Sequence, residues 1–181
     1  MEPPDEVLIR ETLAGDLGSF DELMRYDHLV FKIAYSFCGG RESAFDITQT
    51  VFLKAFDRLG TFRTESSFKT WLMRITYNEG INWTRSPRNR RDLHENIEPT
   101  SEAFSLAAGQ ESHLLLREQR LMIRRGLDLM NDRYRTAILL RYVHDMTISE
   151  IAGVLQCSET MAKNILFRGI RTLKRTLAQT G

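Results

Sequence analysis

Four apolar residues near the C-terminus recur at positions i, i+3, i+4 and i+7: Ile148, Ile151, Ala152 and Leu155. This spacing places them on one face of a short helix. Thr147 precedes the run, and Glu150 lies three residues after it. That is the spacing of a capping box, in which each side chain bonds a backbone N–H at the helix start. The pattern therefore predicts an amphipathic helix that begins directly after Thr147.

A second helix is predicted from Glu159 to Leu177, after a tight turn over residues 156–158 in which Ser158 acts as the cap. One face is apolar or small, and we expect it to pack on the preceding helix: Ala162, Leu166, Gly169 and Leu173. The opposite face mixes cations with a hydroxyl, an amide and a ring: Thr160, Lys163, Asn164, Phe167, Arg168 and Arg171. Cations bind phosphates, while Asn and Arg side chains read base edges. A charged face can also be merely solvated, but a capped helix and turn before it favour a helix-turn-helix that binds the DNA major groove.

The N-terminal half also shows helical periodicity, and strand-type alternation is absent. A first stripe ends at the pair Gly39 and Gly40: Leu23, Tyr26, Val30, Ile33 and Phe37. Ser43 and Asp46 have the spacing of a capping box, so we expect them to start another helix. We expect its apolar side to comprise Phe45, Phe52, Ala55, Phe56 and Leu59. A loop over residues 60–67 then precedes a third helix from Phe68 to Trp83, so the fold class is predicted to be all-α.

Charge is unevenly distributed along the 181 residues, although the net charge is only +1. Residues 85–91 hold four basic and no acidic residues, and residues 119–181 hold eleven basic and five acidic ones. Residues 92–118 between them hold one basic and six acidic residues. A polyanion such as DNA would therefore bind the two basic segments and be repelled by the acidic one.

The acidic segment is also the predicted domain boundary, because it contains Pro99, Gly109 and few ordered apolar positions. We expect an N-terminal helical domain over residues 1–91, a flexible linker over 92–114 and a C-terminal helical domain over 115–181. At about 3.3 Å per residue the linker can extend to roughly 75 Å. The two domains can therefore sit about two helical turns of DNA apart, a turn being about 34 Å.

Candidate catalytic and metal-binding chemistry is sparse in this sequence. Cys38 and Cys157 lack a CxxC partner, and we assign them no role. The four histidines are scattered without HExxH spacing, and no GxxxxGK[ST] phosphate loop occurs. We therefore expect no enzyme activity, no cofactor and no metal. We expect a cytoplasmic protein, because no apolar run approaches about 20 residues and the N-terminus lacks the features of a signal peptide.

Three ordered motifs together resemble one family. They are the segment Asp46–Phe56, the segment Phe62–Ile75 and the terminal helix-turn-helix. In this order, and separated by an acidic linker, they resemble regions 2 and 4 of the extracytoplasmic-function sigma factors of bacterial RNA polymerase. The resemblance implies a protein that binds core polymerase, directs it to promoters through −10 and −35 elements, and assists promoter melting. The alternative is a stand-alone helix-turn-helix transcriptional regulator.

The resemblance implies that Asp46, Gln49 and Thr50 dock on the clamp helices of the polymerase β′ subunit. Asp46 and Gln49 share a helix face. The family usually has an acidic residue where this chain has Thr50. Asp46 has an alternative structural role, because its spacing from Ser43 also fits a capping box. The other implied partners are the polymerase β flap, promoter DNA and an anti-sigma factor.

The resemblance assigns the −10 element to the loop and helix between residues 62 and 83 and to the basic cluster that follows. The implied residues are Phe62, Ser66, Ser67, Asn78, Asn82, Arg85 and Arg88. An aromatic pocket holds a base flipped out of the stack, amides read its edges, and arginines bind phosphates. Trp71 is expected in the core, whereas Trp83 fits the core and base stacking equally well.

The resemblance assigns the −35 element to the mixed face of the last helix. Ile165 stands where the family commonly has a basic residue, which implies fewer contacts to the DNA backbone. The linker resembles the stretch that enters the RNA path of the polymerase, and the alternative is an ordinary solvated tether.

Overall fold

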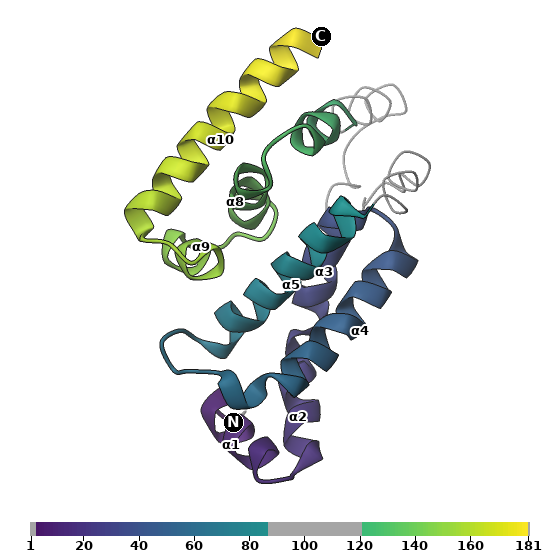
Figure 1. The fold of residues 1–181 in the computed structure, drawn as a ribbon, viewed down its shortest axis with the longest axis vertical. Coiled ribbons are helices and arrows are strands. Elements are labelled where there is room, and N and C mark those ends of the chain that lie inside the picture. Colours follow the sequence, from purple (N-terminus) through teal and green to yellow (C-terminus); the bar gives the residue numbers. More distant parts are fainter. Residues whose placement is uncertain (1–2, 87–120, 181) are drawn as a thin grey trace, which may run out of the picture.

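The computed structural model describes residues 3–86 and 121–180. Within these ranges the chain forms two successive groups of helices and no strands (Figure 1). The first group comprises α1 (Asp5–Leu13), α2 (Leu17–Leu23), the 3-10 turn Met24–Tyr26, α3 (Asp27–Cys38), α4 (Arg41–Asp57), the 3-10 turn Leu59–Thr61 and α5 (Phe68–Arg85). The second comprises helical residues 121–128, α8 (Asp132–Tyr142), α9 (Ile148–Leu155) and α10 (Glu159–Thr180). The prediction of two all-α domains is confirmed.

Local signals set several helix ends in the N-terminal domain. Helix α3 ends at Gly39, whose φ of 73° is left-handed and suits a residue without a Cβ atom. Asp16 caps α2 by accepting a hydrogen bond from the Gly18 N–H at 2.9 Å. Ser67 caps α5 by accepting one from the Thr70 N–H at 3.2 Å. These side chains bond N–H groups that have no partner inside their own helix.

The core of the N-terminal domain lies between α3, α4 and α5. Phe37 of α3 and Phe68 of α5 are among its largest fully buried side chains. A Cβ atom at Gly80 of α5 would lie only 2.4 Å from the Phe37 ring. Glycine at position 80 therefore allows this ring to pack directly on α5.

Helix α4 differs from its sequence-based prediction in two ways. It begins at Arg41 after Gly40, without a side-chain cap, so the predicted start at a box of Ser43 and Asp46 is wrong. Phe45 and Phe56 are 54% and 43% exposed, so their assignment to the buried side is also wrong. The residues that α4 buries follow a different helical stripe: Ala44, Ile47, Val51, Phe52 and Ala55. The two exposed rings instead contact other rings, Phe45 that of Phe31 and Phe56 that of Phe20.

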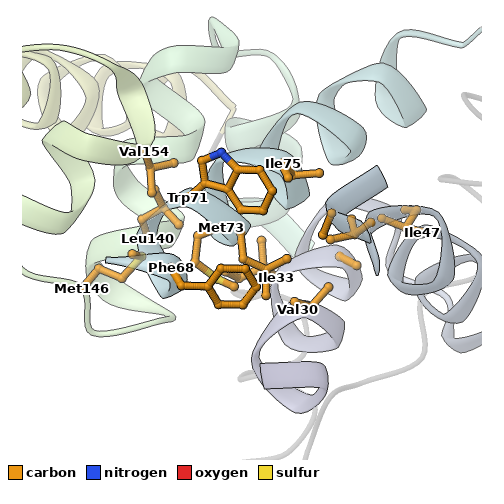
Figure 2. Packing of buried hydrophobic residues seen from close by; sticks show 14 of the residues in the cluster. Val30, Ile33, Ile47, Phe68, Trp71, Met73, Ile75, Leu140, Met146 and Val154 are labelled. Carbon is orange, nitrogen blue, oxygen red and sulfur yellow. The ribbon is translucent and has the colours of Figure 1, made fainter. Parts of the chain in front are cut away.

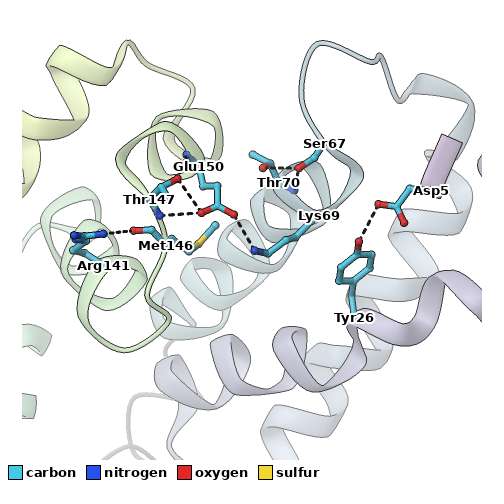
Figure 3. Close-up of polar contacts among 9 residues, drawn as sticks. All are labelled: Asp5, Tyr26, Ser67, Lys69, Thr70, Arg141, Met146, Thr147 and Glu150. Atoms are coloured by element: carbon cyan, nitrogen blue, oxygen red, sulfur yellow. Dashed lines mark hydrogen bonds and ion pairs between the residues drawn. The ribbon is translucent and has the colours of Figure 1, made fainter. Parts of the chain in front are cut away.

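The predicted capping box at the start of α9 is confirmed (Figure 3). The Glu150 N–H donates to Thr147 Oγ1 at 3.2 Å, and the Thr147 N–H donates to Glu150 Oε2 at 2.9 Å. Helix α9 ends at Gln156, which has a left-handed φ of 52°. Ser158 then accepts a hydrogen bond from the Met161 N–H at 3.2 Å at the start of α10. The sequence therefore contains the signals that separate these two helices.

Helix α10 packs on α8 as well as on α9. A Cβ atom at Gly169 would lie 3.3 Å from side-chain atoms of both Tyr134 and Ile138 of α8. The expectation that Gly169 packs on α9 is therefore wrong. Ile165 is only 7% exposed, so it belongs to the core of this domain and not to the outer face.

The two domains touch where α9 lies against α5. Figure 2 shows Phe68 and Trp71 of α5 in one apolar cluster with Leu140, Met146 and Val154 of the C-terminal domain. No helix within the described ranges is both long enough and apolar enough to cross a membrane.

Candidate nucleic-acid and polymerase-binding surfaces

The outer face of α10 is the first candidate surface. Its six residues are all exposed: Thr160, Lys163, Asn164, Phe167, Arg168 and Arg171. Phe167 is 68% exposed. Ala162, Ile165 and Gly169 lie on the opposite, buried face. The structure thus separates a packing face from an exposed face, and the six residues lie on the exposed one.

The charge on α10 is strongly biased. Glu159 in the first turn is its only acidic residue, whereas five basic residues follow: Lys163, Arg168, Arg171, Lys174 and Arg175. Among residues 3–86 and 121–180, no ion pair involves any of these five cations. They are therefore available for phosphates or base edges.

The loop before α5 is the second candidate surface. The half-buried Phe62 ring lies 5.9 Å from the Phe68 ring and 5.6 Å from the Trp71 ring, edge to face in both cases. Trp71 is 6% exposed, which confirms its place in the core. Trp83 is half-buried. Phe62 therefore forms the outer edge of an aromatic group whose inner members are fixed by packing.

The hydroxyl groups and amides near this loop are placed unequally. Ser67 is exposed, but its hydroxyl caps α5 and also lies 2.9 Å from Thr70 Oγ1. Ser66 is half-buried. Asn78 and Asn82 are both exposed and lie one turn apart on α5. The two amides thus present hydrogen-bonding groups on one helix face.

The arginines predicted after this helix are only partly described. Arg85 is exposed and forms an ion pair with Asp132 of α8, with 2.8 Å between Nη2 and Oδ2. Arg88 and the linker over 92–114 lie outside the described residues. Arg85 therefore has a carboxylate partner from the C-terminal domain in this structure.

The third candidate surface is the outer face of α4. Asp46 and Gln49 are exposed one turn apart. The alternative in which Asp46 caps the helix is wrong, since α4 begins before it without a side-chain cap. The half-buried Thr50 donates its hydroxyl to the Asp46 carbonyl at 2.8 Å, so that hydroxyl is turned toward the backbone. Asp46 and Gln49 remain the accessible polar groups.

Two domain-sized family models match the chain. Sigma-70 region 2 matches residues 23–91, and Sigma-70 region 4 matches residues 120–173. The ECF RNA polymerase sigma-E factor of Escherichia coli K12 is 30% identical over 172 residues, which cover 91% of this chain and 89% of that protein. The chain belongs to the extracytoplasmic-function sigma factors. The resemblance seen in its three motifs is therefore confirmed.

Other relatives of this sigma factor agree with the assignment. The RNA polymerase sigma-H factor of Pseudomonas aeruginosa is 28% identical over 183 residues, covering 96% of this chain and 93% of that one. The fold resembles that of CnrH in complex with the cytosolic domain of CnrY, with a TM-score of 0.66, 20% identity and coverage of 98% and 99%. It also resembles sigma factor RpoE in complex with anti-sigma factor NepR from Bartonella quintana, with a TM-score of 0.56, 22% identity and coverage of 87% and 95%.

One exposed residue of this sigma factor escaped the sequence analysis. Leu53 is 68% exposed and lies one turn after Gln49 on the outer face of α4. Phe45 and Phe56 border the same face. The predicted buried stripe contained Phe45 and Phe56 and left Leu53 out, so the sequence analysis did not reveal this apolar surface. The apolar residues of this helix that lie outside the buried stripe of positions 44, 47, 51, 52 and 55 form the exposed apolar surface, and sorting the helix by periodicity would have revealed them.

The cysteines of this sigma factor are both free thiols. Cys38 is buried, and burial raises the pKa of its thiol. Its Sγ donates a weak hydrogen bond to the Gly40 carbonyl at 3.3 Å. No group of three or more His, Cys, Asp or Glu side chains in the described part of the chain is placed to hold a metal ion.

Proposed function

We propose that this chain binds core RNA polymerase, directs it to promoters by recognising −10 and −35 elements, and assists promoter melting. The observation that carries the proposal is the exposed outer face of α10 in a member of the sigma factor family. It presents cations, an amide and a ring on the recognition helix of a helix-turn-helix. The protein acts in the cytoplasm and has no enzyme activity of its own. Its domains are residues 1–91 and 115–181, joined by residues 92–114.

Reconstitution with core polymerase tests the proposal. The purified protein should co-purify with core polymerase and support run-off transcription from a cognate promoter. A template already unpaired at −10 removes the cost of base extrusion, which is a few kcal/mol. If transcription depends less on the protein with this template than with duplex DNA, then part of the protein's action is promoter melting. Tight binding of promoter DNA without core polymerase, and no transcription with it, would instead identify a stand-alone regulator.

The −10 element is assigned to the loop and outer face of α5. Phe62, Ser66 and Ser67 line a pocket for a flipped base, and stacking on an aromatic ring contributes about 1–3 kcal/mol per base. Asn78 and Asn82 read base edges at its rim. Arg85 and Arg88 bind phosphates. The support is that Phe62 lies at the accessible edge of a fixed aromatic group and that both amides are exposed.

The partners follow from the same assignment. Asp46 and Gln49 contact the β′ clamp helices with help from Leu53, and Thr50 supports the backbone of this segment. The C-terminal domain contacts the β flap. One solved structure with this fold is of sigma factor RpoE in complex with anti-sigma factor NepR, which supports an anti-sigma factor as a further partner.

Charge reversal at Asp46 is expected to weaken binding to core polymerase. The Asp46→Arg variant should bind about tenfold more weakly, equivalent to about 1.4 kcal/mol. Its helix content should be unchanged, because the side chain is exposed and caps nothing. Pull-down titration measures the affinity, and circular dichroism measures the helix content. The Asp21→Arg variant makes the same charge change at an exposed position of α2. Equal losses of polymerase affinity in the two variants would refute the docking assignment.

Two cations of α10 are expected to affect promoter binding differently. Arg168 lies on the outer face, where its forked guanidinium reaches guanine O6 and N7. Arg168→Ala should therefore weaken binding to the preferred −35 element by about 1–3 kcal/mol. It should also reduce the discrimination between bases at one position of that element. Lys174→Ala should weaken binding to all DNA sequences alike. It should also reduce the slope of the logarithm of the binding constant against the logarithm of the salt concentration by about one.

Holoenzyme binding to −35 variants at several salt concentrations measures both effects. Lys174 serves as the matched control, since it is exposed on the same helix. If Arg168→Ala lowers affinity for all −35 variants equally and keeps the base preference, then Arg168 binds a phosphate. In that case a different face of α10 contacts the bases.

A further inference from the structure

The turn between α9 and α10 sets the direction in which the recognition helix leaves the helix before it. Gln156 follows the last residue of α9 with a left-handed φ of 52°, and α10 begins three residues later at Glu159. A residue with a side chain adopts the left-handed conformation at a cost in free energy. Contacts from the surrounding structure must therefore hold the turn in this shape.

The last carbonyl groups of α9 show which contacts these are. A helix leaves its final four carbonyl groups without partners in the helix itself. The N–H groups of the two residues after α9 bond the carbonyl groups of Ala152 and Gly153. The carbonyl group of Leu155 belongs to the peptide bond that leads into Gln156, and it accepts a hydrogen bond from Nη2 of Arg133 at 3.2 Å. Arg133 of α8 therefore orients the peptide group directly before the left-handed residue.

A second arginine of α8 bonds the opposite end of α9. Nη1 of Arg141 donates to the Met146 carbonyl at 3.0 Å, directly before the capping box that begins at Thr147 (Figure 3). The two arginines lie eight residues apart on α8, so this helix binds both ends of α9. Of the two bonds, the one from Arg133 lies at the turn that leads into α10. It also places a cation at the C-terminus of α9, where the helix dipole is negative and a charged donor is favourable.

The other contacts of α10 are apolar and have little directional preference. Ala162 and Ile165 are buried, and Gly169 approaches α8 closely. Groups that read a ligand must be held to within about 0.5 Å. A rotation of about 10° around the contact at Gly169 would move Thr160, roughly 13 Å away along the helix, by about 2 Å. A directional bond at the turn is therefore needed to keep the first turns of α10 in place.

We infer that Arg133 is a positioning residue for recognition of the −35 element. Its bond to the Leu155 carbonyl sets the direction of α10 and so the places of the residues at the start of its outer face, Thr160, Lys163 and Asn164. Arg133 acts through the turn and is assigned no contact with a base. The inference rests on the proposed function, since it takes the outer face of α10 as the surface that reads the −35 element.

Arg133→Gln and Arg141→Gln, each in the full chain assembled with core polymerase, test the inference as a matched pair. Both remove one charge and one bond from α8 to a backbone carbonyl, and glutamine has nearly the helix propensity of arginine. Holoenzyme affinity is measured for −35 elements that differ by single base pairs. Arg133→Gln should reduce discrimination about tenfold at the base pairs read by the first turns of α10, within the range that one well-placed side chain provides. Arg141→Gln should leave the base preference unchanged.

The conservative variant Arg133→Lys provides a rescue. It keeps a cationic donor, and one carbonyl acceptor needs only one N–H group. The lysine variant should therefore retain the base preference of the wild type. If Arg133→Gln weakens binding to all −35 variants equally, or if Arg141→Gln alters the preference as much, then Arg133 only stabilises the domain and the inference is overturned.

Amide hydrogen exchange in the free protein gives a readout that does not depend on DNA. The N–H groups of Gln156 and Cys157 form the hydrogen bonds of the turn, so they should exchange faster in Arg133→Gln than in the wild type and in Arg141→Gln. Unchanged exchange at both groups would show that Arg133 does not hold the turn. A wild-type holoenzyme without any −35 preference would instead refute the proposed function of α10, and the exchange comparison would still decide on the turn.

Discussion

Alanine at position 37 should destabilise the N-terminal domain by about 3–5 kcal/mol, the usual cost of removing a buried phenyl ring. Phe37 is 2% exposed, and its ring packs on Gly80 of α5 and beneath the Arg135 guanidinium. For a domain of this size, each kcal/mol lowers the melting temperature by roughly 4–8 °C. A thermal melt followed by circular dichroism should therefore show a loss of at least about 12 °C.

Phe45→Ala is the matched control for this substitution. It removes the same ring, but Phe45 is 54% exposed and its ring centre lies 4.7 Å from that of Phe31. Loss of one exposed ring pair should cost less than about 1 kcal/mol. Equal destabilisation by the two variants would show that α4 buries the side the sequence predicted and that the observed stripe is wrong.

Acidification should destabilise the protein through His144. Burial, helped by the nearby Lys32 ammonium, lowers the pKa of this imidazole from 6.5 to about 4, and its Nε2 atom is buried without a hydrogen-bond partner among the described residues. Between these two pH values the unfolded chain binds a proton that the folded chain does not. The stabilisation present above pH 6.5 is therefore lost as the pH falls toward 4. The loss should be on the order of 3 kcal/mol.

Urea denaturation of the wild type and of His144→Gln at several pH values between 7 and 4 measures this loss. Glutamine does not titrate, so the difference between the two proteins isolates the histidine from the carboxylates that also titrate near pH 4. The difference in the free energy of unfolding should change across this range. A constant difference would mean that His144 is protonated in the folded protein at the same pH as in the unfolded chain.

The caps of α9 and α10 were predictable because they depend on neighbours in sequence. Thr147 and Glu150 are three residues apart, and the signal in their spacing is the same whether or not the rest of the chain is folded. The outer face of α10 was predictable for a similar reason, since polar residues at helical spacing have one consistent solvent side. The family motifs added the order of the two domains.

Burial within a helix was harder to predict, because it depends on which neighbour each face meets. In α4 several stripes contain apolar residues, and the chain buries the one with small residues such as Ala44 and Ala55. Gly169 likewise meets α8 and not α9, which no spacing along α10 reveals. Propensity and periodicity give a helix its candidate faces, and tertiary packing chooses among them.

Contacts between the domains were not predictable from the sequence at all. A Cβ atom at Gly153 would lie 2.6 Å from Thr70 Cγ2. Thr70 lies in the Phe62–Ile75 motif and Gly153 in the helix-turn-helix, but neither motif predicts that the two positions meet. The sequence analysis assigned no role to Arg135 and assigned Arg85 to phosphate binding. In the structure Arg135 is buried and Arg85 is paired with Asp132. A single sequence contains no signal for such pairs, because the partners are set by the way two folded surfaces fit.

Substitutions at position 150 should be pleiotropic. One oxygen of the Glu150 carboxylate accepts the Thr147 N–H at the start of α9, and the other accepts the Lys69 ammonium of the opposite domain. A substitution at this position therefore alters the start of the helix-turn-helix and the contact between the domains together. The DNA-binding module is therefore constrained at this position by the neighbouring domain as well as by the helix that it caps.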